Sequence, residues 1–396
     1  MLSFLLKKAD INEDISLGNT KITSLIRILI FISVLSCFTH PNAARAVVGA
    51  VALFFLILPQ TRKHLFDYRG SKIILVFLSI TSVVALINAN YMGFLAALML
   101  LGMLIVTNTA RSFMTEKFYE GILDFMCIGS VFASVYSIFE KFVIYKDVPA
   151  YRAMAWFPNP NFFGATLMLV ILVCAYKIVK GGKYSFLYLF VAIINGIGIL
   201  NCESMSLWLI AFIGVFMLLL LSRKYLLLSI LLTFTAAVVA VMYFYPHLFE
   251  RLDEIEGTTN NRILIWNFAI EQFKEVPIFG RGFFSYRHLY NIYKDVRFVY
   301  KAALCHNILL DSLLCHGIVG TSIAGTFFIQ YLRDMFSYRK RLKEIKGNRL
   351  ISTFIISVFI ALAFYGIIDT TLVWIQGGTV LMLIACGIGV EEKAIT

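Results

Sequence analysis

Hydrophobic residues in this chain form long uninterrupted runs separated by short polar connections. Runs of roughly 18 residues, wound as α-helices, are long enough to cross a hydrocarbon core of about 30 Å. A membrane β-barrel would instead show short segments of alternating apolar and polar residues. The pattern predicts an all-α polytopic membrane protein with about 12 transmembrane helices. We expect these spans near residues 23–39, 43–58, 71–89, 91–108, 118–142, 161–178, 184–200, 205–222, 225–245, 306–331, 350–368 and 372–390.

The composition supports a membrane protein and argues against a soluble nucleic-acid-binding protein. Of the 396 residues, 60% are hydrophobic and 15% are charged, which would leave a soluble domain of this size with a largely apolar surface. The formal net charge of +12 would suggest nucleic-acid binding in a soluble protein. Here the basic residues anchor one face of the membrane, so we expect no nucleic-acid partner.

The distribution of basic residues predicts the orientation. The connections on one side have no Lys or Arg near residues 40–42, 88–90 and 201–203. The connections on the other side carry Arg62, Lys63, Arg69, Lys72, Arg111, Lys117, Lys177, Lys180, Lys183, Arg223, Lys224, Arg333, Arg339, Lys340, Arg341, Lys343, Lys346 and Arg349. The positive-inside rule then places both termini in the cytoplasm. No small-residue cleavage site follows the first apolar run after Lys7 and Lys8, so no removable signal peptide is expected.

Two outward-facing stretches are long enough to build a site, residues 145–161 and residues 246–304. The chain is therefore expected to be one transmembrane domain, residues 1–396, with one large extracytoplasmic loop at 246–304. Within that loop, apolar side chains recur at spacings of three and four, which predicts an amphipathic helix for the membrane surface over residues 260–274. These side chains are Ile263, Trp266, Ile270 and Phe273.

His306 follows the large loop directly, where polar sequence gives way to a predicted span. An imidazole can act as a general base near neutral pH, and ionisable groups close to membrane depth are often functional. A histidine at the end of a span is, however, more often a structural hydrogen-bonding residue. Asn307 and Asp311 can orient the ring or a substrate, or can cap the helix that begins here.

Arginine side chains in the outward-facing stretches are candidates for holding an anion. A guanidinium binds phosphate oxygens through two parallel hydrogen bonds, so Arg262, Arg152 and Arg281 are candidates for a lipid diphosphate. Each of them could instead be solvated or paired with a loop carboxylate. Asn159 and Asn161 can donate to sugar hydroxyls, although the prolines beside them also suit a capped helix start.

No motif indicates a metal or a cofactor. The seven cysteines include no Cys-x-x-Cys pair, and most lie within or beside predicted spans, so we expect them to be small apolar packing residues. No Asp-x-Asp pair or His/Cys cluster has the spacing of metal ligands.

Short motifs between residues 150 and 320 occur in a defined order. They are Arg152 with Asn159-Pro160-Asn161-Phe162-Phe163-Gly164, Asn261-Arg262 with Trp266, Pro277 with Gly280 and Gly282, and His306-Asn307 with Leu310, Gly317 and Gly320. Together with the twelve-span layout and the large outer loop, this order resembles the superfamily of O-antigen ligases and O-antigen polymerases.

The resemblance implies an inverting, metal-independent membrane glycosyltransferase of GT-C type, whose donor is a glycan on undecaprenyl diphosphate. It implies that His306 is the catalytic base and that Arg262 binds the diphosphate of the donor. The family's second arginine falls at Met205 in this chain. Three cations could replace it: Arg152, Arg281 and Lys301. The implied location is the bacterial inner membrane, with the active site on the outer face, and a flippase and a chain-length regulator are candidate partners.

Three functions are compatible with these expectations. The first is polymerisation of a surface polysaccharide (O-antigen, capsule or exopolysaccharide), in which the glycan passes to a sugar hydroxyl of another lipid-linked repeat. The alternative is an O-antigen ligase that transfers the glycan to lipopolysaccharide core. A flippase for lipid-linked oligosaccharides belongs to another class, and transporters of that kind usually carry charged or broken helices at mid-membrane. The predicted spans here are nearly free of charge.

Overall fold

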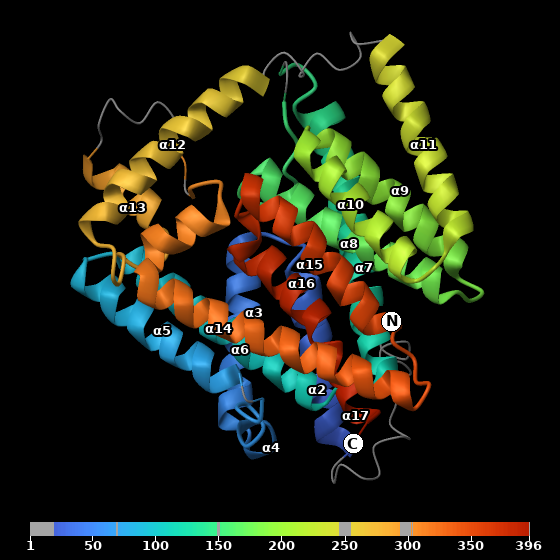
Figure 1. Cartoon of the computed structure of the whole chain (residues 1–396), viewed down its shortest axis with the longest axis horizontal. Coiled ribbons are helices and arrows are strands. Elements are labelled where there is room, and N and C mark those ends of the chain that lie inside the picture. The colour runs from blue at the N-terminus through green and yellow to red at the C-terminus, as the bar shows by residue number, and fades with distance from the viewer. Residues whose placement is uncertain are drawn as a thin grey trace.

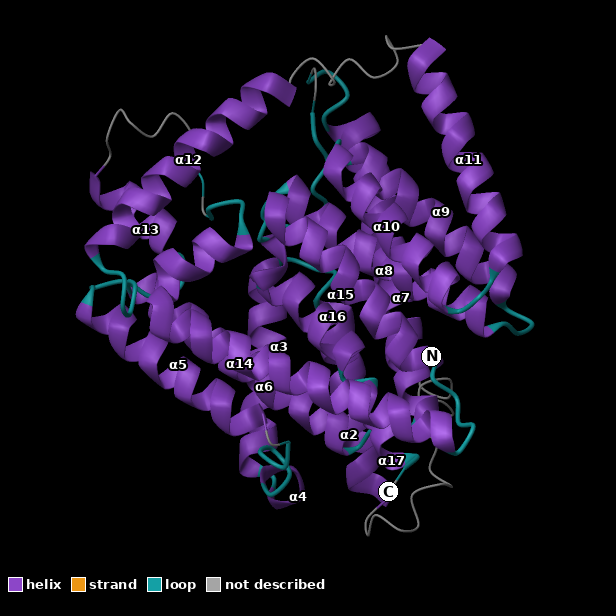
Figure 2. Ribbon diagram, in the orientation of Figure 1, coloured by secondary structure: helices purple, strands orange, loops and turns teal. Residues whose placement is uncertain are grey.

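The computed structural model describes residues 20–68, 70–148, 151–244, 255–293, 302 and 304–395. Within these residues every regular element is a helix, and none is a strand (Figures 1 and 2). The polytopic α-helical class predicted from the hydrophobic runs agrees with this architecture.

The long helices lie where the hydrophobic runs are. They are α2 (Thr20–Ser36), α3 (Pro41–Ile57), α5 (Gly70–Ile87), α6 (Tyr91–Ser112), α7 (Glu116–Phe139, continued by a π-helical turn, Glu140–Ile144), α8 (Pro160–Lys180), α9 (Ser185–Asn201), α10 (Met205–Leu221), α11 (Tyr225–Phe244), α14 (Ile308–Glu344), α15 (Leu350–Ile368) and α16 (Ile375–Ala385). By length and composition, seven helices of the described chain can cross a membrane, and four further apolar helices are shorter. A multi-pass membrane protein is therefore supported, while the count of 12 spans stays a prediction.

The remaining helices are short or polar. They are α4 (Pro59–Arg62), α12 (Ile255–Glu275), α13 (Ser285–Tyr293), α17 (Ile388–Lys393) and a 3₁₀ turn at Thr371–Val373. α12 covers the stretch for which the amphipathic pattern predicts a helix. Figure 1 shows α12 and α13 at the opposite end of the molecule from α4 and α17. The parts of the large loop at residues 245–254, 294–301 and 303 lie outside the described residues, as do Lys7 and Lys8.

α8 lies at the centre of the packing, where it contacts α9, α10, α15 and α16. Most of its side chains are buried, which is expected for a helix that is apolar on every side. The helix begins with Asn159 as its N-cap and Pro160 in its first turn, because proline lacks the N–H that the first turn leaves unpaired. This start places Asn161 at the end of the helix that borders the candidate site.

Charged side chains meet near the start of α7 and the end of α8. Lys177 on α8 has a side chain only 6% exposed, and its Nζ lies 2.5 Å from Glu120 Oε2 and 2.8 Å from Asp124 Oδ1 on α7. Tyr176 and Tyr188 donate hydrogen bonds to the same two carboxylates. Since buried charges are tolerated only when they are paired and hydrogen-bonded, this cluster joins the two helices.

α14 is broken near its start. Gly317 has a φ of +60°, which a side chain would strain. The segment that follows α12 runs into the break and supplies the hydrogen bonds that the helix loses, because the N–H groups of Ile318 and Val319 donate to Pro277 and Ile278 at 2.8 and 3.0 Å. On the other side of the break, the Gly282 N–H donates to the Cys315 carbonyl at 2.7 Å.

Glycine is required where these two backbones meet. A Cβ on Gly280 would lie 2.6 Å from the backbone carbonyl carbon of Cys315, and a Cβ on Gly317 would collide with the Ile278 carbonyl. The Pro277, Gly280, Gly282 and Gly317 positions of the sequence motifs thus form one interlock. It sets the direction of the first turns of α14, which follow His306.

Candidate active site

His306 lies on the short segment that leads into α14. Its φ of +52° is a left-handed conformation, which is costly for a residue other than glycine and is concentrated at functional sites. The preceding peptide is held from two sides. Trp266 Nε1 on α12 donates to the Cys305 carbonyl at 3.0 Å, and the Cys305 N–H donates to Asp311 Oδ1 on α14 at 3.0 Å. The two helices together fix the position of the imidazole.

The indole of Trp266 thus has a partner inside the protein, although the sequence pattern suggested a place at the lipid headgroups. The buried face of α12 is formed by Ile265 and Ala269, which pack with Tyr286 and Cys305. Ile263 is 45% exposed. The side of α12 that packs against the protein contains Ile265 and Ala269. It is therefore rotated about the helix axis from the side predicted by the spacing of the apolar residues, which contains Ile263 and Ile270.

The imidazole of His306 faces Asp369, the residue that ends α15. Nδ1 lies 3.1 Å from Oδ1 of Asp369, whose side chain is 3% exposed against 23% for the histidine. The same Oδ1 accepts the Thr370 N–H at 2.7 Å. A carboxylate in this place accepts a hydrogen from Nδ1 and leaves the lone pair on Nε2. No hydrogen-bond partner for Nε2 exists within the described chain.

Asp369 is tied in turn to the start of α8. Asn161 Nδ2 donates to Asp369 Oδ2 at 3.1 Å, and Arg152 Nη2 donates to Asn161 Oδ1 at 2.8 Å. Arg152 Nε also donates to the Cys202 carbonyl at 3.0 Å, in the connection between α9 and α10. The structure therefore brings three of the residues predicted for the site, Arg152, Asn161 and His306, into one hydrogen-bonded chain.

Both of the other candidate asparagines cap helices. Asn159 Oδ1 accepts the Asn161 N–H at 2.8 Å, and Asn307 Oδ1 accepts the N–H groups of Leu309 and Leu310 at 3.1 Å each. The alternative of a capping role, considered from the sequence, is thus observed for both. Asn159 is also exposed and Asn307 is half-buried, and contact with a sugar stays a prediction for them and for Asp311.

Arg262 is on α12, one helical turn before Trp266. Residues four apart lie on the same side of a helix, and Trp266 reaches the peptide next to His306. The Arg262 side chain is half-buried. It forms no hydrogen bond or ion pair with any residue that the structure describes, and a diphosphate contact stays a prediction for it.

Arg281 has a different environment. Its Nη2 forms an ion pair with Glu275 Oε2 at 2.6 Å, and its side chain is 11% exposed. Its backbone belongs to the interlock, because the Arg281 N–H donates to the Cys315 carbonyl at 3.2 Å. Nε of Arg281 is buried without a hydrogen-bond partner among the described residues. A diphosphate contact by Arg281 stays a prediction, as does one by Lys301, which lies outside the described residues together with the Met205 side chain.

Asp369 was not among the residues that the sequence suggested. One signal could have found it, because it is the only Asp, Glu, Lys or Arg between Arg349 and Glu391. A lone carboxylate between two apolar spans is expensive to bury and therefore marks a functional or paired position.

The chemistry available at the site is acid–base and electrostatic. The residues that the structure describes contain no group of three or more His, Cys, Asp or Glu side chains placed to hold a metal ion. Burial raises the pKa of the Cys305 thiol well above its usual range, which disfavours the nucleophilic thiolate form. The arrangement provides a histidine, a buried carboxylate that contacts its Nδ1, and an arginine on α12, the helix whose Trp266 holds the peptide before that histidine.

The chain was compared with curated proteins and with protein-family models. No curated protein matches the chain. Residues 189–325 match a family model described as O-antigen ligase. The matched part contains Arg262, Trp266 and His306, while Arg152, Asn161 and Asp369 lie outside it. Over these residues, the match confirms the resemblance to the O-antigen ligase and polymerase superfamily.

Proposed function

We propose that this protein transfers a glycan from undecaprenyl diphosphate to a sugar hydroxyl, with His306 as the general base. The observation that carries the proposal is the hydrogen bond between His306 Nδ1 and buried Asp369, in a site whose histidine and Arg262 both fall within the O-antigen ligase match. A carboxylate that holds Nδ1 prepares Nε2 to take a proton, which is the role of a general base.

In the proposed reaction, the acceptor hydroxyl gives its proton to Nε2 of His306 while its oxygen attacks the anomeric carbon. The bond between that carbon and the diphosphate oxygen breaks, and the diphosphate leaves with the electron pair. Attack from the face opposite the leaving group inverts the anomeric configuration. Asp369 stabilises the imidazolium that forms, and Arg262 stabilises the negative charge that develops on the diphosphate.

The acceptor distinguishes two versions of this activity. A polymerase would transfer the growing chain to a sugar of another lipid-linked repeat, giving O-antigen, capsule or exopolysaccharide, and this is our first choice. A ligase would transfer the same donor to lipopolysaccharide core, and the description of the matched family model favours this second version. Both use the same base and the same leaving group.

The proposed location is the bacterial inner membrane, with both termini in the cytoplasm and the site on the outer face. The positive-inside distribution of Lys and Arg supports this orientation. It is also supported by the separation of α12 and α13 from α4 and α17 in Figure 1. A flippase and a chain-length regulator remain candidate partners, since the donor must reach the outer face before transfer.

The lipid-linked glycans of a deletion strain test the proposal. Accumulated single repeats indicate a polymerase, long chains that are not ligated indicate a ligase, and repeats trapped on the inner face indicate a flippase. Complementation with H306A should give the same profile as the deletion, while the variant protein is inserted at the wild-type level. Full restoration of product by H306A would contradict the base assignment.

A further inference from the structure

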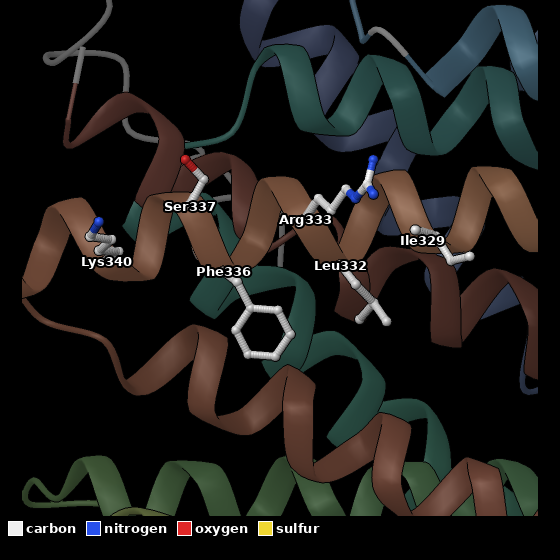
Figure 3. A pocket seen from close by; sticks show the side chains of 6 residues that line it. All are labelled: Ile329, Leu332, Arg333, Phe336, Ser337 and Lys340. Atoms are coloured by element: carbon white, nitrogen blue, oxygen red, sulfur yellow. The ribbon is translucent and has the colours of Figure 1, made fainter.

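A shallow groove on α14 lies far from His306 and takes no part in the proposed reaction. It has a volume of about 520 Å³. Its lining residues, called the α14 groove below, are Ile329, Leu332, Arg333, Phe336, Ser337 and Lys340. Figure 3 shows Arg333, Ser337 and Lys340 along one edge of the helix and Leu332 and Phe336 along the other. The groove thus pairs a basic, polar edge with an apolar edge.

The groove is on the side of α14 that the rest of the protein leaves uncovered. Tyr331 and Met335, on the opposite side, are buried at 8% and 0% exposure, and Tyr331 donates to the Ala385 carbonyl. In contrast, Ile329 and Phe336 are 52% and 53% exposed. Exposed apolar side chains on a membrane-spanning helix face the lipid acyl chains.

The cations of the groove differ from Arg339 and Arg111, which have partners inside the protein. Arg339 Nη1 donates to Ser352 and Thr353, and Arg111 pairs with a glutamate at 2.8 Å. Arg333 and Lys340 are exposed and form no hydrogen bond or ion pair within the part of the chain that the structure describes. Two exposed cations beside an apolar surface therefore have no anionic partner among the described residues.

The position along α14 places these cations at a membrane boundary. The part of α14 after the break at Gly317 begins with Ile318, and Arg333 is 15 residues further along it, about 22 Å at 1.5 Å per residue. Beyond Arg333 the helix carries Arg339, Lys340, Arg341 and Lys343, and such clusters of basic residues mark the cytoplasmic end of a span. The proposed orientation therefore puts the groove at the cytoplasmic surface.

We propose that the α14 groove binds an anionic glycerophospholipid of the inner leaflet. Its phosphate lies between Arg333 and Lys340, beside the Ser337 hydroxyl, and its acyl chains lie along Ile329, Leu332 and Phe336. Each Lys or Arg near a membrane surface favours anionic lipid, and the apolar edge distinguishes a phospholipid from free phosphate. This binding site is independent of the glycosyl transfer proposed above.

Native mass spectrometry of the full chain in neutral detergent tests the proposal. The wild type should bind phosphatidylglycerol in preference to phosphatidylcholine. R333Q/K340Q should bind phosphatidylglycerol roughly 30-fold more weakly, or five- to sixfold for each charge, with phosphatidylcholine unchanged. R333K/K340R, which keeps both charges, should retain the preference.

The matched control is R341Q/K343Q, which removes the same charge from exposed positions of α14 outside the groove. It should leave the preference unchanged. Equal loss in the two double variants would overturn the proposal, because the effect would then follow net charge. A wild type without preference, or displacement of the lipid by inorganic phosphate alone, would overturn it as well. If R333Q/K340Q does not fold, the single variants R333Q and K340Q give the same comparison.

Discussion

Replacing Asp369 with Asn removes the charge that faces His306 and keeps the shape of the side chain. When the imidazole takes a proton from the acceptor, it becomes a cation beside a carboxylate that is 3% exposed, with Nδ1 3.1 Å from Oδ1. A unit negative charge about 4 Å away stabilises a cation by about 4 kcal/mol at an effective dielectric constant of about 20. Because about 1.4 kcal/mol corresponds to tenfold in rate, we expect kcat of D369N to fall by about 10³.

The hydrogen bonds around position 369 give a second reason why Asn should replace Asp369 poorly. A guanidinium only donates, so the Asn161 atom that faces Arg152 is the oxygen, and the amide nitrogen of Asn161 faces Asp369. Asp369 must therefore accept from Asn161 on one oxygen and from Thr370 and His306 on the other. The side-chain amide in D369N has only one acceptor atom. Its NH₂ group would therefore face either the Asn161 NH₂ group or the donors of Thr370 and His306.

The assay is glycan transfer by the purified protein in liposomes, with lipid-linked donor and kcat and KM measured separately. We expect KM for the donor to stay near the wild-type value, because Asp369 acts on the imidazole and not on the diphosphate. D334N is the matched control, since Asp334 accepts from Gln330 near the other end of α14. A wild-type kcat in D369N, with an unchanged melting temperature, would refute the reasoning, and so would an equal loss in D334N.

Three further substitutions test separate parts of the structure. R262A should raise KM for the lipid-linked donor by about 10- to 150-fold, because a hydrogen bond to a charged group contributes about 1.5–3 kcal/mol; donor saturation equal to the wild type would remove Arg262 from the diphosphate site. K177M should lower the free energy of unfolding by about 3 kcal/mol, because Glu120 and Asp124 would lose the buried ammonium that lies between them, and Lys180 pairs with Glu120 alone; an unchanged melting temperature would contradict this. G317A should cost about 1–3 kcal/mol in thermal stability because of its positive φ. G325A, where a Cβ would meet no atom within 4 Å, should not be destabilised, and equal melting of the two variants would show that the interlock is not strained.

The positions of the helices could be predicted because the physical requirement is local. A membrane-spanning helix satisfies its own backbone hydrogen bonds and needs only a long apolar run, so α8 and α15 lie where the runs are. The break in α14 depends on a distant segment, since Pro277 and Ile278 supply its hydrogen-bond acceptors. Glycines in the sequence marked both partners of this interlock, but their spacing did not show that they meet.

In the candidate site, too, the residues set by local sequence could be predicted and the contacts between distant segments could not. His306, Arg152 and Asn161 were identifiable because polar residue types at the ends of spans are rare and chemically specific. The link between them was not identifiable, because it passes through Asp369, which follows His306 by 63 residues. Contacts of this kind arise where the ends of helices from separate parts of the chain meet, and no periodicity in the sequence encodes such a meeting.

The partners of the three arginines predicted for the diphosphate now distinguish them. Arg152 already donates through Nε and Nη2 to Cys202 and Asn161, so we expect it to orient the hydrogen-bonded chain that ends at His306. Arg281 is paired with Glu275, and an anion would have to compete with that carboxylate. Arg262 forms no hydrogen bond or ion pair with a described residue, and it lies on the same side of α12 as Trp266. A diphosphate that leaves a sugar beside His306 would therefore be bound first by Arg262, with Arg152 acting on the base through Asn161 and Asp369.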